Sequence, residues 1–415
     1  KEARSEDSLY LNIWTPANVK AGEKLPVLFY IHGGSLNSGQ SYYRDYNGET
    51  LAKKGIIVVT ITYRLGVFGY LANDELAAES ENNTTGNYGL LDQIAALQWV
   101  NDNINSFGGD KDNITIAGES AGASSVNAIC VSPLAKGLFR RAVAESSGIT
   151  AVVPYHTFRT MEDAKKVGND ILKEFNCDSV EELRQIPAEK LVDTRYSNNE
   201  MTVDGYAITE QPYLTYEKGE NNEEAILGGY NANEAYVFLM FSKDVTLDNY
   251  ERTLRWLVGR EGAEELEKMY PAATDEEAWE NYVEIMGLIG FGYSHYRWSE
   301  LMTAEERPAY LYYFTKENGG IGTWHAGEMP YMYGNLFRNP GCYDESDEAL
   351  SETMQSYLVN YVTTGNPNGG DLPEWKTYGE ECDQIMSFGE KVGMIEQKHN
   401  DFYKIVDTYM EGLRE

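Results

Sequence analysis

The pentapeptide Gly118-Glu119-Ser120-Ala121-Gly122 has the residue types and the spacing of a serine nucleophile in a sharp turn. It follows the short strand-like stretch 113–117 and precedes a stretch of small residues with helical character. Between a strand and a helix, such a turn points the serine hydroxyl away from the sheet, and the glycines leave room for neighbouring chains. The first amides of the helix favour a developing oxyanion. The pattern predicts nucleophilic catalysis by Ser120, and an ordinary turn with a capping serine is the alternative.

A second turn, His32-Gly33-Gly34-Ser35, ends the apolar run 26–31. Glycines in such a turn let the backbone approach a substrate carbonyl closely and present amide hydrogens to it. By itself the motif is also explained by a simple turn after a strand. Its position ahead of the Ser120 turn is the order expected of a hydrolase, so it predicts backbone donors for an oxyanion.

Five histidines compete for the role of general base, namely His32, His156, His295, His325 and His399. Hydrolases with this kind of turn place the nucleophile, the acid and the histidine in that order along the chain, which excludes His32. His325 follows the strand-like run 310–314, and a loop beyond a late strand can return to the nucleophile. The other three histidines have polar or helical surroundings and are predicted to be non-catalytic.

The triad acid is harder to select, because 66 Asp and Glu residues compete for the role. The strand-like run 225–229 is followed by a loop that contains Glu234, which is the expected kind of strand and loop. A solvated or helix-capping glutamate is the alternative at this position. Asp204 is the second candidate, but Asp204-Gly205 is more typical of a turn.

The elements that must position these residues alternate between strand and helix. Strands are predicted at 9–14, 26–31, 55–63, 113–117, 225–229 and 310–314, and helical stretches at 87–103, 157–195, 246–289 and 344–364. Strands that alternate with helices indicate an α/β fold with parallel pairing and right-handed crossovers. No long linker rich in Pro, Gly or Ser divides the chain, so we expect a single domain over residues 1–415.

Several stretches together make the chain similar to the type-B carboxylesterase family, which includes the cholinesterases and the bacterial para-nitrobenzyl esterases. The matching stretches are 5–12, 87–93, 107–110, 118–122, 229–238 and 322–334, and the para-nitrobenzyl esterase branch is the most similar. The resemblance implies an α/β-hydrolase fold, with a mostly parallel central sheet flanked by helices and with helical insertions over the active site. It also implies a serine carboxylesterase that needs no metal or organic cofactor.

The same resemblance assigns roles to individual residues. Glu234 matches the family's Gly-x-Asn-x-x-Glu motif and His325 its Gly-x-x-His-x-x-Glu motif, which makes them the acid and the base beside Ser120. Ser147 matches a serine that supports the acid and the base by hydrogen bonding. Arg64 and Asp92 match positions that form a structural ion pair.

Three departures from the family pattern modify these expectations. Where the family has a third glycine, this chain has Ser35. Because a backbone amide survives that change, we expect Gly34, Ser35 and Ala121 to form the oxyanion hole. Ser8 replaces a cysteine of the animal members, so their N-terminal disulfide is expected to be missing. Family members also have several dozen residues before Ser5, and we expect the strands and gorge wall that this segment contributes to be missing here.

Composition limits the partners. The 66 acidic and 34 basic residues give a net charge of -32, which disfavours nucleic acid and anionic lipid surfaces, although steering of cationic substrates stays open. The four cysteines lack metal-ligand spacing and suit a reducing cytoplasm, with two disulfide bridges as the alternative. The sequence has no run of about 18 apolar residues, so no membrane span is expected. The chain opens on Lys1 without an initiator Met, so a lost targeting peptide stays open. We expect a monomer or a weak homo-oligomer that acts on small-molecule esters.

Two questions of function stay open at this stage. Some members of the family have lost the nucleophile and become adhesion or binding proteins, and an intact Ser120, Glu234 and His325 argues against that class. Among hydrolases, we expect a carboxylesterase that prefers short acyl chains, and a lipase or an amidase is the alternative. The helical segments also carry aromatic residues that line either a substrate gorge or the core: Tyr236, Phe238, Phe241, Phe291, Tyr293 and Trp324.

Overall fold

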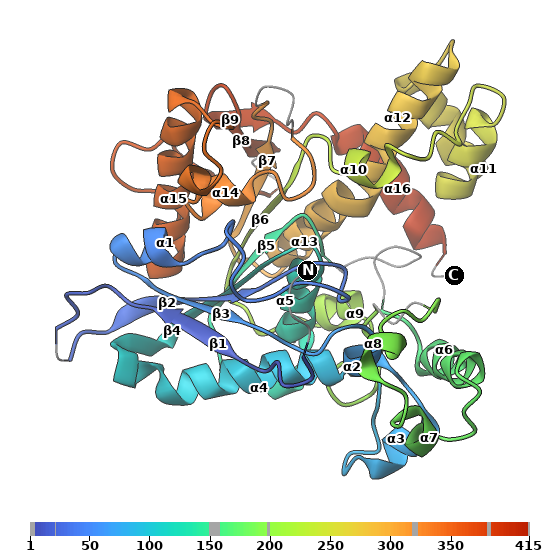
Figure 1. Cartoon of the computed structure of the whole chain (residues 1–415). Helices are drawn as coiled ribbons and strands as arrows, with labels where there is room; N and C mark the ends of the chain where they lie inside the picture. The colour runs from blue at the N-terminus through green and yellow to red at the C-terminus, as the bar shows by residue number, and fades with distance from the viewer. Residues whose placement is uncertain are drawn as a thin grey trace. The chain divides into compact units, whose positions relative to one another are not determined.

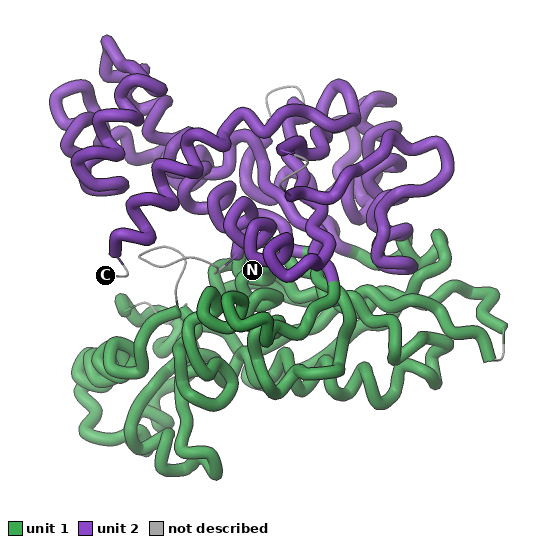
Figure 2. The backbone as a smooth tube through the Cα atoms, turned by 180° about the vertical axis from the view of Figure 1, so that it is seen from behind, with its two compact units in different colours: residues 1–43, 47–143, 158–224 green, residues 44–46, 144–157, 225–415 purple. Residues whose placement is uncertain are grey.

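A computed structural model describes residues 5–20, 22–148, 158–196, 200–317, 323–379 and 383–413. The chain divides into two compact units, which Figure 2 distinguishes by colour. Unit 1 comprises residues 1–43, 47–143 and 158–224, and unit 2 comprises residues 44–46, 144–157 and 225–415. The sequence has no long linker, which predicts that the two units form one domain. This assignment stays a prediction.

The strands of unit 1 have the order β1-β3-β2-β4. Their bounds are β1 (Leu11–Trp14), β2 (Leu25–Ile31), β3 (Ile57–Ile61) and β4 (Gly109–Glu119). β2 is parallel to both β3 and β4, and β1 is antiparallel to β3. Every residue of β3 is buried, as expected of a parallel strand that is covered on both faces. Ile31 pairs with Gly118, so the turn after β2 and the turn after β4 leave the sheet at the same edge.

Some helices of unit 1 lie along its strands, and others gather in a group away from them (Figure 1). Their bounds are α1 (Glu49–Lys53), α2 (Gly66–Tyr70), α3 (Asp74–Glu79), α4 (Tyr88–Asn103), α5 (Ala121–Val131), α6 (Met161–Glu174), α7 (Val180–Leu183), α8 (Ala188–Leu191) and α9 (Pro212–Glu217). α4 and α5 both contact β4, and α4 buries the apolar face that predicted a helix at 87–103. The helical stretch predicted at 157–195 corresponds to α6, α7 and α8.

The strands of unit 2 have the order β6-β7-β8-β9. Their bounds are β6 (Ile226–Asn231), β7 (Ala309–Phe314), β8 (Gln384–Phe388) and β9 (Gly393–Glu396), while β5 (Arg141–Glu145) carries the chain from unit 1 into unit 2. β6, β7 and β8 are parallel, and β9 is antiparallel to β8. Asn231 pairs with Phe314, so the loops that follow β6 and β7 start at the same edge.

The helices of unit 2 follow its parallel strands. Their bounds are α10 (Tyr236–Leu239), α11 (Tyr250–Met269), α12 (Asp275–Gly287), α13 (Tyr293–Ala304), α14 (Met329–Met332), α15 (Glu345–Thr364) and α16 (Asn400–Gly412). α13 contacts β6 and β7, and α11 lies beside α16 in Figure 1. α11 and α12 confirm the helical stretch predicted at 246–289, and α15 confirms the one at 344–364. In the part of the chain that the structure describes, no helix has the length and apolar character that crossing a membrane requires.

Candidate active site

Ser120 lies between β4 and α5 in a backbone conformation that is rare for a residue with a side chain. Its φ is 55° and its ψ is -126°, and such a conformation costs on the order of 1–3 kcal/mol. A Cβ atom on Gly122 would lie within 3.0 Å of the carbonyl oxygens of Ile31 and His32. Only glycine therefore lets the turn pack this closely against β2. The predicted strand, sharp turn and helix are confirmed.

The glycine-rich turn after β2 lies directly against Ser120. A Cβ atom on Gly33 would be 2.7 Å from the Glu119 carbonyl oxygen and 3.1 Å from the Ser120 Cβ. Gly34 and Ser35 follow with φ angles of 101° and 55°, and both are exposed. Ala121 is the first residue of α5. Gly34 and Ser35 therefore follow the residue that packs against Ser120, and Ala121 follows Ser120 itself, all within unit 1.

Two residues considered for the triad have other roles. His32 is buried, its Nδ1 lies 2.8 Å from the Gly33 carbonyl oxygen, and burial lowers the pKa of its imidazole to about 4. The Asp204 carboxylate accepts the backbone N–H groups of Tyr206 and Ile208 at 3.1 and 2.9 Å. Asp204 therefore stabilises its own turn, in agreement with the Asp-Gly pattern.

Glu234 and His325 form a buried acid–base pair in unit 2. The distance from Glu234 Oε2 to His325 Nδ1 is 2.6 Å, and the two side chains are 0% and 10% exposed. The other carboxylate oxygen accepts the Asn231 N–H at 2.7 Å. Because a carboxylate only accepts, His325 Nδ1 carries the proton, and the neutral imidazole keeps Nε2 as a proton acceptor.

The two loops that carry this pair are joined by hydrogen bonds. The Asn231 side chain donates to the Trp324 carbonyl oxygen at 2.8 Å and also to the Glu328 carboxylate. Glu328 is fully buried and accepts the Ser146 hydroxyl at 3.4 Å. Functional roles for Asn231, Glu328 and Ser146 were not predicted from the sequence. A signal was present, because Asn231 and Glu328 are fixed positions in the motifs that identified Glu234 and His325.

His295, His399 and Ser147 also belong to unit 2. The backbone N–H of Ser147 donates to His295 Nε2 at 3.2 Å, and His295 is buried on α13. Support of the acid and the base by the Ser147 hydroxyl stays a prediction. His399 is buried beside Tyr313, and burial lowers its pKa to about 4. His156 lies outside the described residues.

The aromatic residues that were expected to line either a substrate gorge or the core fall into separate groups. Phe238 and Phe291 flank His325, with ring centroids 5.1 and 4.8 Å from the imidazole, and they stack on each other at 6.1 Å. Phe291 lies on a π-helical turn between α12 and α13. Tyr293 is a core residue whose hydroxyl donates to Asp407. Phe241 is 90% exposed, and Tyr236 and Trp324 also lie at the surface. Phe238 combines its contact with His325 with an exposed fraction of 56%.

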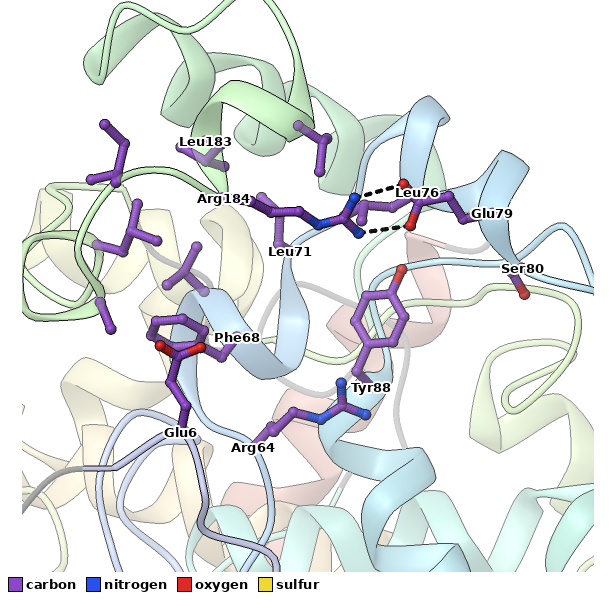
Figure 3. Close-up of a pocket in the computed structure, with 15 residues that line it drawn as sticks. Glu6, Arg64, Phe68, Leu71, Leu76, Glu79, Ser80, Tyr88, Leu183 and Arg184 are labelled. Atoms are coloured by element: carbon purple, nitrogen blue, oxygen red, sulfur yellow. Dashed lines mark hydrogen bonds and ion pairs between the residues drawn. The ribbon is translucent and has the colours of Figure 1, made fainter.

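The predicted ion pair between Arg64 and Asp92 is confirmed. Arg64 Nε and Nη2 donate to the two oxygens of Asp92 at 2.8 Å each. Arg64 also borders a cavity of about 440 Å³ in unit 1, which Figure 3 shows with the Arg184–Glu79 pair at its rim. None of the residues predicted to act in catalysis lines this cavity, so it is separate from the Ser120 turn.

Three of the four cysteines lie in the part of the chain that the structure describes. Cys130, Cys177 and Cys342 are free thiols, and Cys382 lies outside the described residues. Among the residues that the structure describes, no group of three or more His, Cys, Asp or Glu side chains could hold a metal ion.

Comparison with known proteins identifies the relatives of this chain. The model of the carboxylesterase family matches residues 1–405. Fumonisin B1 esterase of Sphingopyxis macrogoltabida is 33% identical over 94% of this chain and 74% of that protein. Para-nitrobenzyl esterase of Bacillus subtilis (strain 168) is 31% identical over 94% of this chain and 80% of that protein.

Solved structures agree with the sequence matches. The PNB esterase structure aligns with a TM-score of 0.81 and 28% identity, covering 97% of this chain and 85% of that chain. The Geobacillus stearothermophilus carboxylesterase EST55 aligns with a TM-score of 0.82 and 32% identity, covering 98% of this chain and 86% of that chain. The fold and the serine turn therefore define an α/β hydrolase. The chain belongs to the carboxylesterase family and is a serine ester hydrolase, which confirms the resemblance seen in the sequence.

Proposed function

We propose that Ser120, Glu234 and His325 form the catalytic triad of this esterase. The observation that carries the proposal is the 2.6 Å bond between the buried Glu234 carboxylate and His325 Nδ1. This bond leaves Nε2 as the acceptor that a serine nucleophile needs. Ser120 lies in unit 1 and the acid–base pair in unit 2, so the approach of His325 to Ser120 is part of the proposal.

The proposed reaction is acyl transfer in two steps. His325 removes the proton from Ser120, whose oxygen attacks the ester carbonyl, and Glu234 stabilises the imidazolium that forms. The N–H groups of Gly34, Ser35 and Ala121 bind the oxyanion, and loss of one such donor lowers kcat by about 10²- to 10³-fold in enzymes of this kind. His325 then protonates the leaving alcohol, and water releases the acid by the same route. No step requires a metal or an organic cofactor.

We propose neutral carboxylic esters of small to medium size as substrates. The Phe238 and Phe291 rings next to His325 offer an apolar surface to an acyl or alcohol group. The net charge of -32 disfavours anionic thioesters such as acyl-CoA. A test panel takes para-nitrobenzyl esters as the neutral substrates, and fumonisin B1, which has free carboxylates, together with a medium-chain acyl-CoA as the anionic ones. A maximum at long acyl chains would favour a lipase instead.

Further parts of the proposal concern the protein in the cell. We propose a bacterial, cytoplasmic enzyme that is a monomer or a weak homo-oligomer and does not bind nucleic acid. The small number of cysteines and the acidic composition support this assignment. Support of the triad by the Ser147 hydroxyl is also proposed. Light scattering over a range of concentrations tests the oligomeric state.

Hydrolysis by single variants tests the triad. We expect Ser120→Ala and His325→Ala each to lower kcat for p-nitrophenyl butyrate by at least about 10³-fold, because each residue takes part in bond making. The matched control is Ser35→Ala, which keeps the backbone N–H and is expected to stay within about fivefold of the parent protein. Full turnover by Ser120→Ala would contradict the assignment of the nucleophile.

A further inference from the structure

Two carbonyl groups in the glycine-rich turn accept hydrogen bonds from residues of the same turn. The Gly33 carbonyl oxygen lies 2.8 Å from His32 Nδ1. The Gly34 carbonyl oxygen accepts the backbone N–H groups of Asn37 and Ser38 at 3.1 and 3.0 Å, and the Ser38 hydroxyl at 3.2 Å. Both carbonyls are therefore fixed in direction before any substrate binds.

The direction of each carbonyl determines the direction of the next N–H. In a planar trans peptide the C=O and the following N–H point to opposite sides. The bond to Gly33 C=O therefore directs the Gly34 N–H away from His32. In the same way, the bonds to Gly34 C=O direct the Ser35 N–H away from residues 37 and 38. These two N–H groups are the ones assigned above to the oxyanion.

We propose that His32 is a positioning residue that holds the oxyanion hole in its active geometry, with Ser38 in a smaller supporting role. The inference rests on the proposed function, because it takes Gly34 and Ser35 as the donors. His32 acts through the Gly33–Gly34 peptide and does not contact substrate. Its contribution differs from that of His325, because no proton moves to or from it.

The surroundings of His32 keep its ring in place. The imidazole stacks on Tyr63 at 4.5 Å with an interplanar angle of 20°, and the Tyr63 hydroxyl donates to the His32 carbonyl oxygen at 2.8 Å. Gly39 has a φ of 124°, and a Cβ atom there would lie within 3.0 Å of both His32 Nδ1 and the Gly33 oxygen. The turn thus closes over the His32–Gly33 bond, and His32 is only 2% exposed.

The bond also fixes the protonation state that the ring needs. A carbonyl oxygen only accepts, so Nδ1 carries the hydrogen. Nε2 is buried and has no hydrogen-bond partner among the residues that the structure describes. A neutral ring leaves Nε2 without a hydrogen, so no buried N–H is left unpaired. His32 therefore remains neutral, with the same hydrogen bond, over the pH range in which His325 acts as a base.

Three substitutions of His32 separate the bond from the packing. His32→Phe keeps the stacking on Tyr63 but removes the donor, and we expect kcat to fall about 10- to 100-fold with KM changed less than about threefold. His32→Asn places an amide N–H near the position of Nδ1 and is expected to recover kcat to within about fivefold. His32→Gln places its amide nearer to Nε2 and is expected to resemble His32→Phe. Ser38→Ala leaves two backbone donors on Gly34 and is expected to lower kcat about two- to fivefold.

Two measurements besides kcat distinguish a positioning role of His32 from a merely structural one. Affinity for a trifluoromethyl ketone, which forms a tetrahedral oxyanion on the serine, is expected to fall in proportion to kcat. The pKa that controls the acidic limb of the pH–rate profile is expected to stay unchanged, because His32 exchanges no proton. His399→Phe removes another buried imidazole, which lies far along the chain in unit 2, and is the matched control with unchanged kcat.

The outcomes distinguish this inference from the triad itself. If wild-type Ser120 reacts with a fluorophosphonate while His32→Phe retains full kcat, or while His32→Asn is as slow as His32→Gln, the positioning role is wrong and the triad stands. If His32→Phe does not fold, the contrast between His32→Asn and His32→Gln decides. If wild-type protein forms no adduct, the triad fails and this inference fails with it.

Discussion

Substitution of Glu234 by glutamine tests how the acid controls the tautomer of His325. The carboxylate has one oxygen bound by the Asn231 N–H at 2.7 Å and the other bound to His325 Nδ1 at 2.6 Å. In Glu234→Gln the Asn231 N–H still requires an acceptor, so it selects the amide oxygen. The amide NH₂ then faces His325 Nδ1, which has to accept. The hydrogen of the neutral ring moves to Nε2, where a base needs a lone pair.

The expected loss is large because this change disables the base without removing it. In a serine protease, changing the triad acid to its amide with the geometry intact lowers kcat by about 10⁴-fold, which corresponds to about 5–6 kcal/mol of barrier. We expect a similar loss for Glu234→Gln in hydrolysis of p-nitrophenyl butyrate, with KM little changed. Glu234→Asp keeps the charge on a shorter side chain and is expected to lose less, about 10²-fold.

The assay needs two measurements to be decisive. Steady-state kinetics gives kcat and KM, and the urea midpoint shows whether the variant is folded. A folded Glu234→Gln protein with kcat within tenfold of the parent would refute the assignment of Glu234 as the residue that orients His325. A loss in Glu234→Asp as large as in Glu234→Gln would refute the argument from the tautomer.

Three further predictions concern stability. Gly122→Ala places a Cβ within 3.0 Å of the Ile31 carbonyl oxygen and is expected to lower the free energy of unfolding by more than about 2 kcal/mol, measured by urea denaturation; an unchanged midpoint would show that the turn can relax. Burial lowers the pKa of His399 from 6.5 to about 4, so the unfolded chain takes up a proton first as pH falls. The stabilisation that comes from keeping His399 neutral is complete above pH 6.5 and declines by about 3 kcal/mol down to pH 4. In His399→Phe the free energy of unfolding is therefore expected to fall less steeply over that interval. An equal dependence on pH in both proteins would contradict this prediction. Asp92→Ala removes the bidentate partner of Arg64 and is expected to cost about 1–2 kcal/mol of unfolding free energy while kcat stays unchanged, and a drop in kcat would assign the pair to the site.

Features that local sequence specifies were predicted well. Gly118 and Gly122 are needed by the packing of one short turn, and buried parallel strands such as β3 are continuous apolar runs, so both appear in the sequence itself. The strand and loop before Glu234 were also visible. The choice of Glu234 among 66 acidic residues came from the family motif, because no local property distinguishes a triad acid.

Features that depend on contacts distant in sequence were not predicted. Ser146 meets Glu328 across 182 residues, and only the fold brings them together. Phe291 reaches His325 from a π-helical turn, whose extra residue interrupts the helical periodicity by which faces are assigned. The direction of the Gly34 N–H depends on a bond between His32 and its neighbour, and residue types alone do not reveal it.

Whether Ser120 is the activated nucleophile is measured by reaction with a fluorophosphonate followed by peptide mass spectrometry. The reagent forms a bond to a serine oxygen only where a base and an oxyanion hole activate that serine. We expect one adduct per chain, on the peptide that contains Ser120, with no adduct in Ser120→Ala and much slower labelling in Glu234→Gln. An unlabelled wild-type protein, or an adduct on a different serine, would contradict it.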